Sequence, residues 1–232
     1  MPKVRVSYYS DVLCIWAYAA QRRLQQMVEE FGDQISIETR YCSVFPDAFG
    51  KIEQTWKTKG GFEGFNLHLI AVAKQFPHLD ISQEVWRSVR PRTSASAHQF
   101  LKAVELVEAD LADGQNPTGP YFEQISVRAA WSLRLAFFRD GKDIADRGVH
   151  EETAASLGLD FGIIKARIRS SEALTRLLID YDHSRRIGVE GSPTFVMNEG
   201  RQKLFGNVGY RVLKANIQEL LHNPSDQEAS WC

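Results

Sequence analysis

Cys14 is the residue whose type and position most strongly suggest chemistry. It follows a strand-like run at residues 3–8 and precedes the amphipathic helical pattern of residues 15–31. A thiol at such a junction meets unpaired backbone N–H groups and the positive end of the helix dipole, which favour the thiolate. The position therefore predicts a nucleophilic thiolate. A small buried hydrophobic residue is the alternative interpretation of a lone cysteine.

A second feature is the proline loop at residues 188–196. Pro193 stands directly before a strand-like run that begins at Thr194. Proline there removes a ladder hydrogen bond, so it requires a sheet edge, the first position of a strand or a cis turn. A cis bond would expose the backbone of Ser192 to an extended peptide or thiol ligand, whereas the alternative is an ordinary turn.

Three further residues are candidates for the same site. Trp16, in the first helical turn after Cys14, either covers the thiol and shapes a substrate groove or is core. Asp11 is expected to be a helix N-cap, and its carboxylate would oppose thiolate formation unless it points away from the sulfur. His98 is expected to be a capping or packing residue, with a position facing the cleft as the alternative.

The cysteine content narrows the protein class. The 232 residues hold three cysteines, at positions 14, 42 and 232, with no C-x-x-C pair. This pattern excludes a disulfide framework and a cysteine-rich zinc site, and it predicts a reducing compartment, the cytoplasm. We expect Cys42 to be buried and inert, and Cys232 to belong to a polar tail.

Charge and hydropathy exclude other classes. The net charge of -1 gives no support to nucleic-acid or membrane-surface binding. The beginning of the chain shows no signal-peptide pattern, and no apolar run approaches the roughly 20 residues of a membrane span. Metalloprotease, P-loop, dinucleotide-binding and serine-hydrolase motifs do not occur, so we expect no metal site.

The predicted elements form an α/β fold of the order β-α-β, helices, β-β-α. A second strand is expected over residues 34–42, five or six helices over residues 51–185, and a hairpin and a last helix over residues 194–222. Domain insertion into a surface connection explains this order. The predicted α/β domain comprises residues 1–50 and 186–222. The insertion domain comprises residues 51–185, and the polar tail comprises residues 223–232.

These motifs together resemble the DsbA-like branch of the thioredoxin superfamily, nearest to its FrnE-like and 2-hydroxychromene-2-carboxylate isomerase-like members. The resemblance covers nearly the whole chain. Four segments carry it: residues 10–18, 94–98, 143–146 and 188–196. They correspond to the family's D-x-x-C-P-W-C-Y opening, to a small polar residue followed by Ala-His, to an acidic loop and to the cis-proline loop. In the opening segment, Ile15 stands where the family often has Pro.

The resemblance implies a thioredoxin-like fold with a large all-helical insertion. It further implies thiol–disulfide oxidoreductase chemistry with Cys14 as the catalytic residue and substrate binding by Trp16, Ser192, Pro193 and Thr194. Ala17 stands where the family has its resolving cysteine, so one thiol must work without an internal partner. The expected substrate is a protein disulfide or a small thiol or disulfide. We expect no tightly bound cofactor and glutathione as a co-substrate. The expected oligomeric state is a monomer or a homodimer.

Two other functions stay open from the sequence. Kappa-class glutathione transferases and the related isomerases carry a serine at the position aligned with Cys14, so Cys14 could activate glutathione in that role. The acidic-Arg pair that grips glutathione in those enzymes is replaced here by residues 205–210, which read Phe-Gly-Asn-Val-Gly-Tyr. A binding module that has lost catalysis with the change to Ala17 is the third interpretation.

Overall fold

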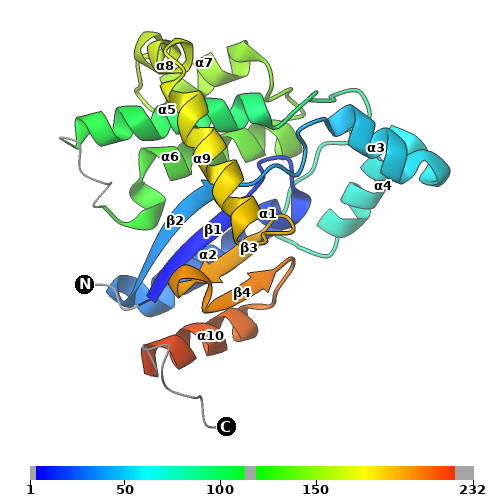
Figure 1. Ribbon diagram of the computed structural model, residues 1–232. Coiled ribbons are helices and arrows are strands. Elements are labelled where there is room, and N and C mark those ends of the chain that lie inside the picture. Colours follow the sequence, from blue (N-terminus) through cyan, green and yellow to red (C-terminus); the bar gives the residue numbers. More distant parts are fainter. Residues whose placement is uncertain (1–3, 113–118, 223–232) are drawn as a thin grey trace.

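The computed structural model describes residues 4–112 and 119–222 and shows a four-stranded sheet with helices around it (Figure 1). Strands β1 (Val4–Ser10) and β2 (Ile35–Tyr41) flank α1 (Ile15–Ala19) and α2 (Gln21–Phe31). The later elements are α3 (Ala48–Trp56), α4 (Gly61–Ala73), α5 (Ala95–Leu111), α6 (Ile125–Arg134), α7 (Arg147–Ser156), α8 (Phe161–Arg169), α9 (Glu172–Arg186), β3 (Thr194–Met197), β4 (Gln202–Phe205) and α10 (Tyr210–His222). The predicted order of elements is confirmed. Cys232 and the predicted tail lie outside the described residues.

The sheet is mixed and has the strand order β2-β1-β3-β4. β1 runs parallel to β2 and antiparallel to β3, and β3 pairs antiparallel with β4. β1 is thus a central strand, which explains why its aromatic end is buried on both faces at Tyr8 and Tyr9. The carboxyl end of β1 leads directly to Cys14, and β3 begins directly after Pro193.

Each face of the sheet has its own helical cover. α2 and α10 bury one face, where Val6 and Tyr8 contact Leu24 of α2 and Ile217 of α10 in one apolar cluster. The opposite face has a smaller cluster around Tyr9, which includes Cys42 and Val196. In Figure 1, α9 crosses in front of the sheet while α5 to α8 gather beyond its upper end. The division into an α/β domain and an insertion domain stays a prediction.

A buried ion cluster joins the helical region to β2. Asp180 of α9 accepts a hydrogen bond from Tyr41 N at 3.1 Å, an ion pair from Lys102 of α5 at 2.7 Å and another from Arg40 at 3.1 Å. A buried carboxylate is tolerated only with such partners. The cluster holds α9 against the sheet. The proline loop follows directly after the end of α9.

The structure divides the helical segments more finely than the sequence predicted. The predicted helix of residues 15–31 is interrupted at Ala20, and residues 121–139 form a 3-10 turn, α6 and a π-helical turn. The segment after Asp160 contains α8, which Asp160 caps through Gly162 N at 2.7 Å, and α9, which begins after Ser171, where φ is 67°. Within the described residues, seven α-helices, α3 to α9, therefore lie where the sequence predicted five or six.

Within residues 4–112 and 119–222, the helices are too short or too polar to span a bilayer. The same ranges contain no group of three or more His, Cys, Asp and Glu side chains placed to hold a metal ion.

Candidate active site

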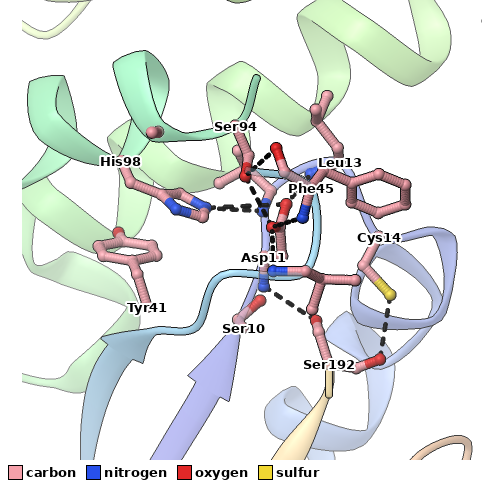
Figure 2. Close-up of polar contacts among 12 residues, drawn as sticks. Ser10, Asp11, Leu13, Cys14, Tyr41, Phe45, Ser94, His98 and Ser192 are labelled. Carbon is pink, nitrogen blue, oxygen red and sulfur yellow. Dashed lines mark hydrogen bonds and ion pairs between the residues drawn. The ribbon is translucent and has the colours of Figure 1, made fainter. Parts of the chain in front are cut away.

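Cys14 lies at the N-cap position of α1, after a turn in which its own N–H donates to Asp11 O at 3.1 Å. Only 6% of the residue is exposed. Its Sγ donates a hydrogen bond to the carbonyl oxygen of Ser192 at 3.1 Å (Figure 2). The structure therefore brings together the two features that the sequence singled out, although 178 residues separate them.

Burial controls the acidity of this thiol. It raises the pKa of Cys14, and the charge of Asp11 acts in the same direction. The Ser192 side chain and the backbone N–H groups of Ala17 and Trp16 act to lower this pKa, but they do not outweigh burial. Burial thus opposes the thiolate that the sequence predicted at this helix terminus. α1 has five residues, so its dipole is small, and the sulfur has lost its contact with water.

The proline loop is fixed by its own polar contacts. The Ser192–Pro193 peptide bond is cis, one of the arrangements that the sequence allowed. Ser192 Oγ accepts a hydrogen bond from Asp11 N at 2.9 Å, and Pro193 O accepts one from Gly206 N at 2.8 Å. Thr194 Oγ1 donates to Gly191 O at 2.7 Å. Ser192 thus faces Cys14. Pro193 and Thr194 are buried, and their hydrogen bonds to Gly206 and Gly191 hold the loop in place.

Asp11 has a structural position that differs from the predicted N-cap. Its Oδ1 accepts from Leu13 N at 2.9 Å, and its Oδ2 accepts from Val44 N and Phe45 N, both at 3.1 Å. Oδ2 also accepts from the Ser94 hydroxyl at 2.7 Å. Figure 2 shows this carboxylate turned away from the sulfur and toward the loop after β2. It is fully buried and lies outside the cleft.

His98 is also fully buried, within α5, so its predicted packing position is the one observed. Its Nε2 accepts a hydrogen bond from Val12 N at 3.2 Å, and its Nδ1 lies 2.8 Å from the Tyr181 hydroxyl. The ring stacks on Tyr41, with ring centroids 4.7 Å apart. Burial lowers the pKa of His98 to about 4, so the imidazole is neutral at pH 7. It does not line the pocket beside Cys14.

A pocket of about 230 Å³ has Cys14 among its lining residues. Its walls are mostly apolar and come from four parts of the chain: the start of α1, the loop after β2, α4, and the proline loop with the end of β4. The lining residues are Leu13, Cys14, Ile15, Trp16, Val44, Phe45, Phe65, His68, Leu69, Glu190, Gly191, Ser192 and Phe205. Of the predicted site residues, the pocket therefore contains Cys14, Trp16 and Ser192.

Sequence reasoning missed the contribution of α4 to this pocket. Phe65, His68 and Leu69 follow the helical spacing i, i+3, i+4, but nothing in that spacing indicates which face meets Cys14. Burial and the charge of Lys59 lower the pKa of His68, which makes it a neutral polar group in an apolar wall. A pocket of this size suits one side chain or ring of a ligand with its sulfur toward Cys14.

Cys42, directly after β2, is 3% exposed, and burial raises the pKa of its thiol. The predicted burial of Cys42 is confirmed. This cysteine does not line the pocket of Cys14.

Comparisons with known proteins agree with this geometry. Residues 123–218 match the family described as the DSBA-like thioredoxin domain. The chain has a DsbA-like thioredoxin fold. The resemblance to that branch, predicted from the sequence, is confirmed. No curated protein matches the chain at a significant level.

Three solved structures show the extent of the likeness. A candidate protein disulfide isomerase from Nitrosomonas europaea shares 14% identity over 96% of this chain and 99% of its own, with a TM-score of 0.74. The cytosolic disulfide reductase DsbM from Pseudomonas aeruginosa shares 20% identity over 92% and 98%, with a TM-score of 0.62. A 2-hydroxychromene-2-carboxylate isomerase shares 15% identity over 97% and 100%, with a TM-score of 0.61.

The carboxylate of Asp11 should be essential for stability. We expect Asp11→Ala to lower the free energy of unfolding by about 3–5 kcal/mol, because it leaves buried N–H and O–H donors without an acceptor. Asp11→Asn, which keeps one acceptor oxygen, should lose less. Urea denaturation measures both. The exposed Asp33→Ala is the control, with an expected change within about 0.5 kcal/mol. An Asp11→Ala protein as stable as the control would contradict the geometry.

His98 should make stability depend on pH. Its folded pKa of about 4 lies below the ordinary value of about 6.5, so its contribution is complete above pH 6.5. It is lost as the pH falls from 6.5 to 4, by about 3 kcal/mol. Unfolding free energies of the wild type and His98→Gln should therefore converge over this interval. Glu105, whose pKa burial raises to about 7, has the opposite sign but is present in both proteins. Parallel curves would contradict the assignment.

Alkylation should report the raised pKa of Cys14. We expect its rate with iodoacetamide to rise about tenfold per pH unit from pH 6 to 9 without a plateau, because only the thiolate reacts. Peptide mapping by mass spectrometry separates the label on Cys14 from that on Cys42 and Cys232. A plateau below pH 8 would show a thiolate stabilised by the helix terminus after all.

Proposed function

We propose that the protein is a thiol–disulfide oxidoreductase that works through one cysteine, Cys14. The observation that carries the proposal is the Cys14 sulfur at an apolar pocket, 3.1 Å from the carbonyl oxygen of Ser192 in a cis-proline loop. Trp16 and Ser192 contact the substrate on either side of the sulfur. Pro193 and Thr194, which we expected to bind substrate, hold the loop in place for Ser192.

The reaction is a thiol–disulfide exchange in two steps. The Cys14 sulfur attacks a substrate disulfide R–S–S–R′, so that the bond Cys14–S–S–R forms and R′–S⁻ leaves and takes up the proton that Cys14 gave up. A second, external thiol then attacks the adduct, releases Cys14 as thiol and carries away R in a new disulfide. Position 17 is occupied by Ala17, which has no sulfur, so the second step requires the external thiol.

Because the pKa of Cys14 is raised, the thiol must lose its proton before it attacks the disulfide, and substrate binding promotes that loss. In the unliganded site the thiol proton is held by Ser192 O, and the sulfur is out of water. An extended substrate that pairs with the Ser192 backbone competes for that oxygen and frees the thiol proton. Reactivity is thereby coupled to occupation of the pocket, which protects the lone thiol from indiscriminate oxidation.

The substrate class is a protein disulfide or a small disulfide, with glutathione as the external thiol. DsbM, a structurally similar protein, has been solved with glutathione and is described as cytosolic. We assign the same compartment to this chain because its cysteine pattern suits reducing conditions and glutathione is the abundant thiol there. A monomer or a homodimer carries one such site per chain.

A glutathione-dependent isomerase or transferase is the second candidate. The aromatic walls of the pocket at Trp16, Phe45 and Phe65 favour a ring-bearing substrate, and the isomerase neighbour has the same fold. This function predicts a thermal shift with glutathione that Cys14→Ser retains. A third candidate, a non-catalytic binding module, is favoured by the burial of Cys14 and predicts ligand binding that survives Cys14→Ala, with no turnover of any disulfide.

Ala17→Cys tests the single-thiol mechanism. All variants carry Cys232→Ser, so that the tail thiol does not contribute. With glutathione disulfide the chain with Ala17 should release one glutathione and retain the adduct, since no second thiol displaces it. Ala17→Cys should release two, because a thiol at position 17 attacks the adduct and closes a disulfide. Ellman titration of the released thiol, after the protein has been removed by filtration, counts both. Cys14→Ser should release none, and Cys42→Ala should behave as the chain with Ala17. Release of two equivalents by the chain with Ala17 would contradict the mechanism.

A further inference from the structure

Four cations near α3 and α4 lie over the rings of one aromatic cluster. Each of the four side chains has its charged group within 5.3 Å of a ring centroid. The pairs are Lys51 over Phe45 at 5.0 Å, Lys59 over Trp56 at 5.3 Å, Arg90 over Phe62 at 4.4 Å and Arg92 over Phe49 at 4.0 Å. About one such contact per 70–80 residues is typical of proteins, so four within residues 45–92 are a concentration. We call these four cations the basic surface.

Lys51 and Lys59 lie beside the wall of the apolar pocket. Phe45 and Phe65 line that pocket, and the ring of Trp56 packs 5.2 Å from the ring of Phe65. Lys51 therefore lies over one lining ring, and Lys59 is separated from another by a single ring. An extended chain advances about 3.3 Å per residue. A carboxylate within a few residues of a disulfide in the pocket can thus reach both ammonium groups.

Arg90 and Arg92 extend the basic surface beyond the pocket. The rings beneath them, Phe62 of α4 and Phe49 of α3, contact each other with centroids 5.1 Å apart. Neither of these two rings lines the pocket. Figure 1 shows α3 and α4 as a helical hairpin at the right of the molecule, apart from the sheet. A small disulfide in the pocket does not reach the two guanidinium groups, whereas a polypeptide that continues past the pocket does.

Within residues 4–112 and 119–222, none of the four cations pairs with a carboxylate, and all four are exposed. Two nearby carboxylates are engaged elsewhere, since Glu63 pairs with Arg87 at 3.3 Å and Asp47 caps the start of α3. Glu53 has Lys57 four residues later, which offsets its charge. The basic surface therefore keeps a local positive charge, although the net charge of the chain is -1.

The ring contacts favour a partner that carries carboxylates. A cation over an aromatic face keeps the N–H donors at its edge available, and the guanidinium fork matches a carboxylate in two hydrogen bonds. The cations and the neighbouring rings cover the ring faces, so little surface is left for the stacking of nucleotide bases. An acidic polypeptide therefore suits this surface better than a nucleic acid. Glu190, the one acidic residue that lines the pocket, repels carboxylates from the proline loop and directs them toward α3 and α4.

We propose that the basic surface binds an acidic segment of a polypeptide substrate whose disulfide enters the pocket of Cys14. The inference rests on the proposed function and names its substrate class, a protein disulfide flanked by Asp or Glu residues. The steps of the exchange are unchanged, because the basic surface forms only ion pairs with the substrate. Complementary charge mainly raises the rate of productive encounter, so the preference should appear in the rate of exchange at low ionic strength.

Three peptides of one sequence test the inference, with Glu, Gln or Lys at the positions that flank a single cysteine. The cysteine is joined in a mixed disulfide to 2-mercaptoethanol, which is neutral. Each rate with the protein, which carries Cys232→Ser, is divided by the rate of the same peptide with N-acetylcysteine amide. At low ionic strength we expect the Glu peptide to react about tenfold faster than the Gln peptide, and the Lys peptide to be the slowest. About 0.5 M salt should remove most of the difference.

Lys51→Gln/Lys59→Gln should lower the advantage of the Glu peptide to about threefold or less, while the rate with the Gln peptide stays unchanged. Arg22→Gln/Arg169→Gln is the matched control and should keep the tenfold advantage. It removes the same two charges from exposed side chains of α2 and α8. Within the described residues, these two side chains lie over no aromatic ring and do not line the pocket.

Fluorescence anisotropy with the same peptides, their cysteine replaced by serine, separates the basic surface from the redox chemistry. Equal rates for the Glu and Gln peptides, or an equal loss in the control variant, would overturn the inference and leave the proposed function intact. Tighter binding of a short oligothymidine than of the Glu peptide would also overturn it. Binding of the serine form of the Glu peptide without exchange of any peptide disulfide at Cys14 would instead remove the proposed function and leave the basic surface as a polypeptide-binding site.

Discussion

The buried carboxylate of Asp11 is the interaction on which the site depends. A carboxylate taken out of water is costly unless its oxygens accept several hydrogen bonds, and the donors here come from distant segments. Leu13 belongs to the turn before Cys14, Phe45 to the loop after β2, and Ser94 to the beginning of α5. The backbone of Asp11 completes the set by donating to Ser192. One residue thus joins three of the parts that surround the Cys14 pocket.

The same burial that makes Asp11 a strong anchor limits the reactivity of Cys14. Cys14 is 6% exposed as a residue, and the five-residue helix that follows does not compensate for the loss of water around its thiol. In this thioredoxin-like fold the Cys14 thiol donates its hydrogen bond to Ser192 O. Under the proposed function, selectivity therefore comes from the disulfide that enters the apolar pocket beside Cys14.

Local pattern was sufficient for the skeleton of the site and insufficient for its chemistry. The strand-to-helix junction at Cys14 and the proline before β3 can each be predicted from a few consecutive residues. The order of the helices and strands follows from the periodicity of the apolar residues. The acidity of Cys14, the inward turn of the Thr194 hydroxyl and the contact of His68 with the pocket depend on packing between segments far apart in the chain. The helix dipole depends on one helix, whereas the burial of the Cys14 thiol depends on the packing of the whole fold.

Mass spectrometry of the folded chain after exposure to glutathione disulfide tests the central claim most directly. With Cys232 replaced by Ser, we expect one adduct per chain, mapped to Cys14, with Cys42 unmodified, and full return to the original mass when a thiol is added. A folded protein whose Cys14 stays unmodified under these conditions, or in which Cys42 takes the adduct first, would contradict it.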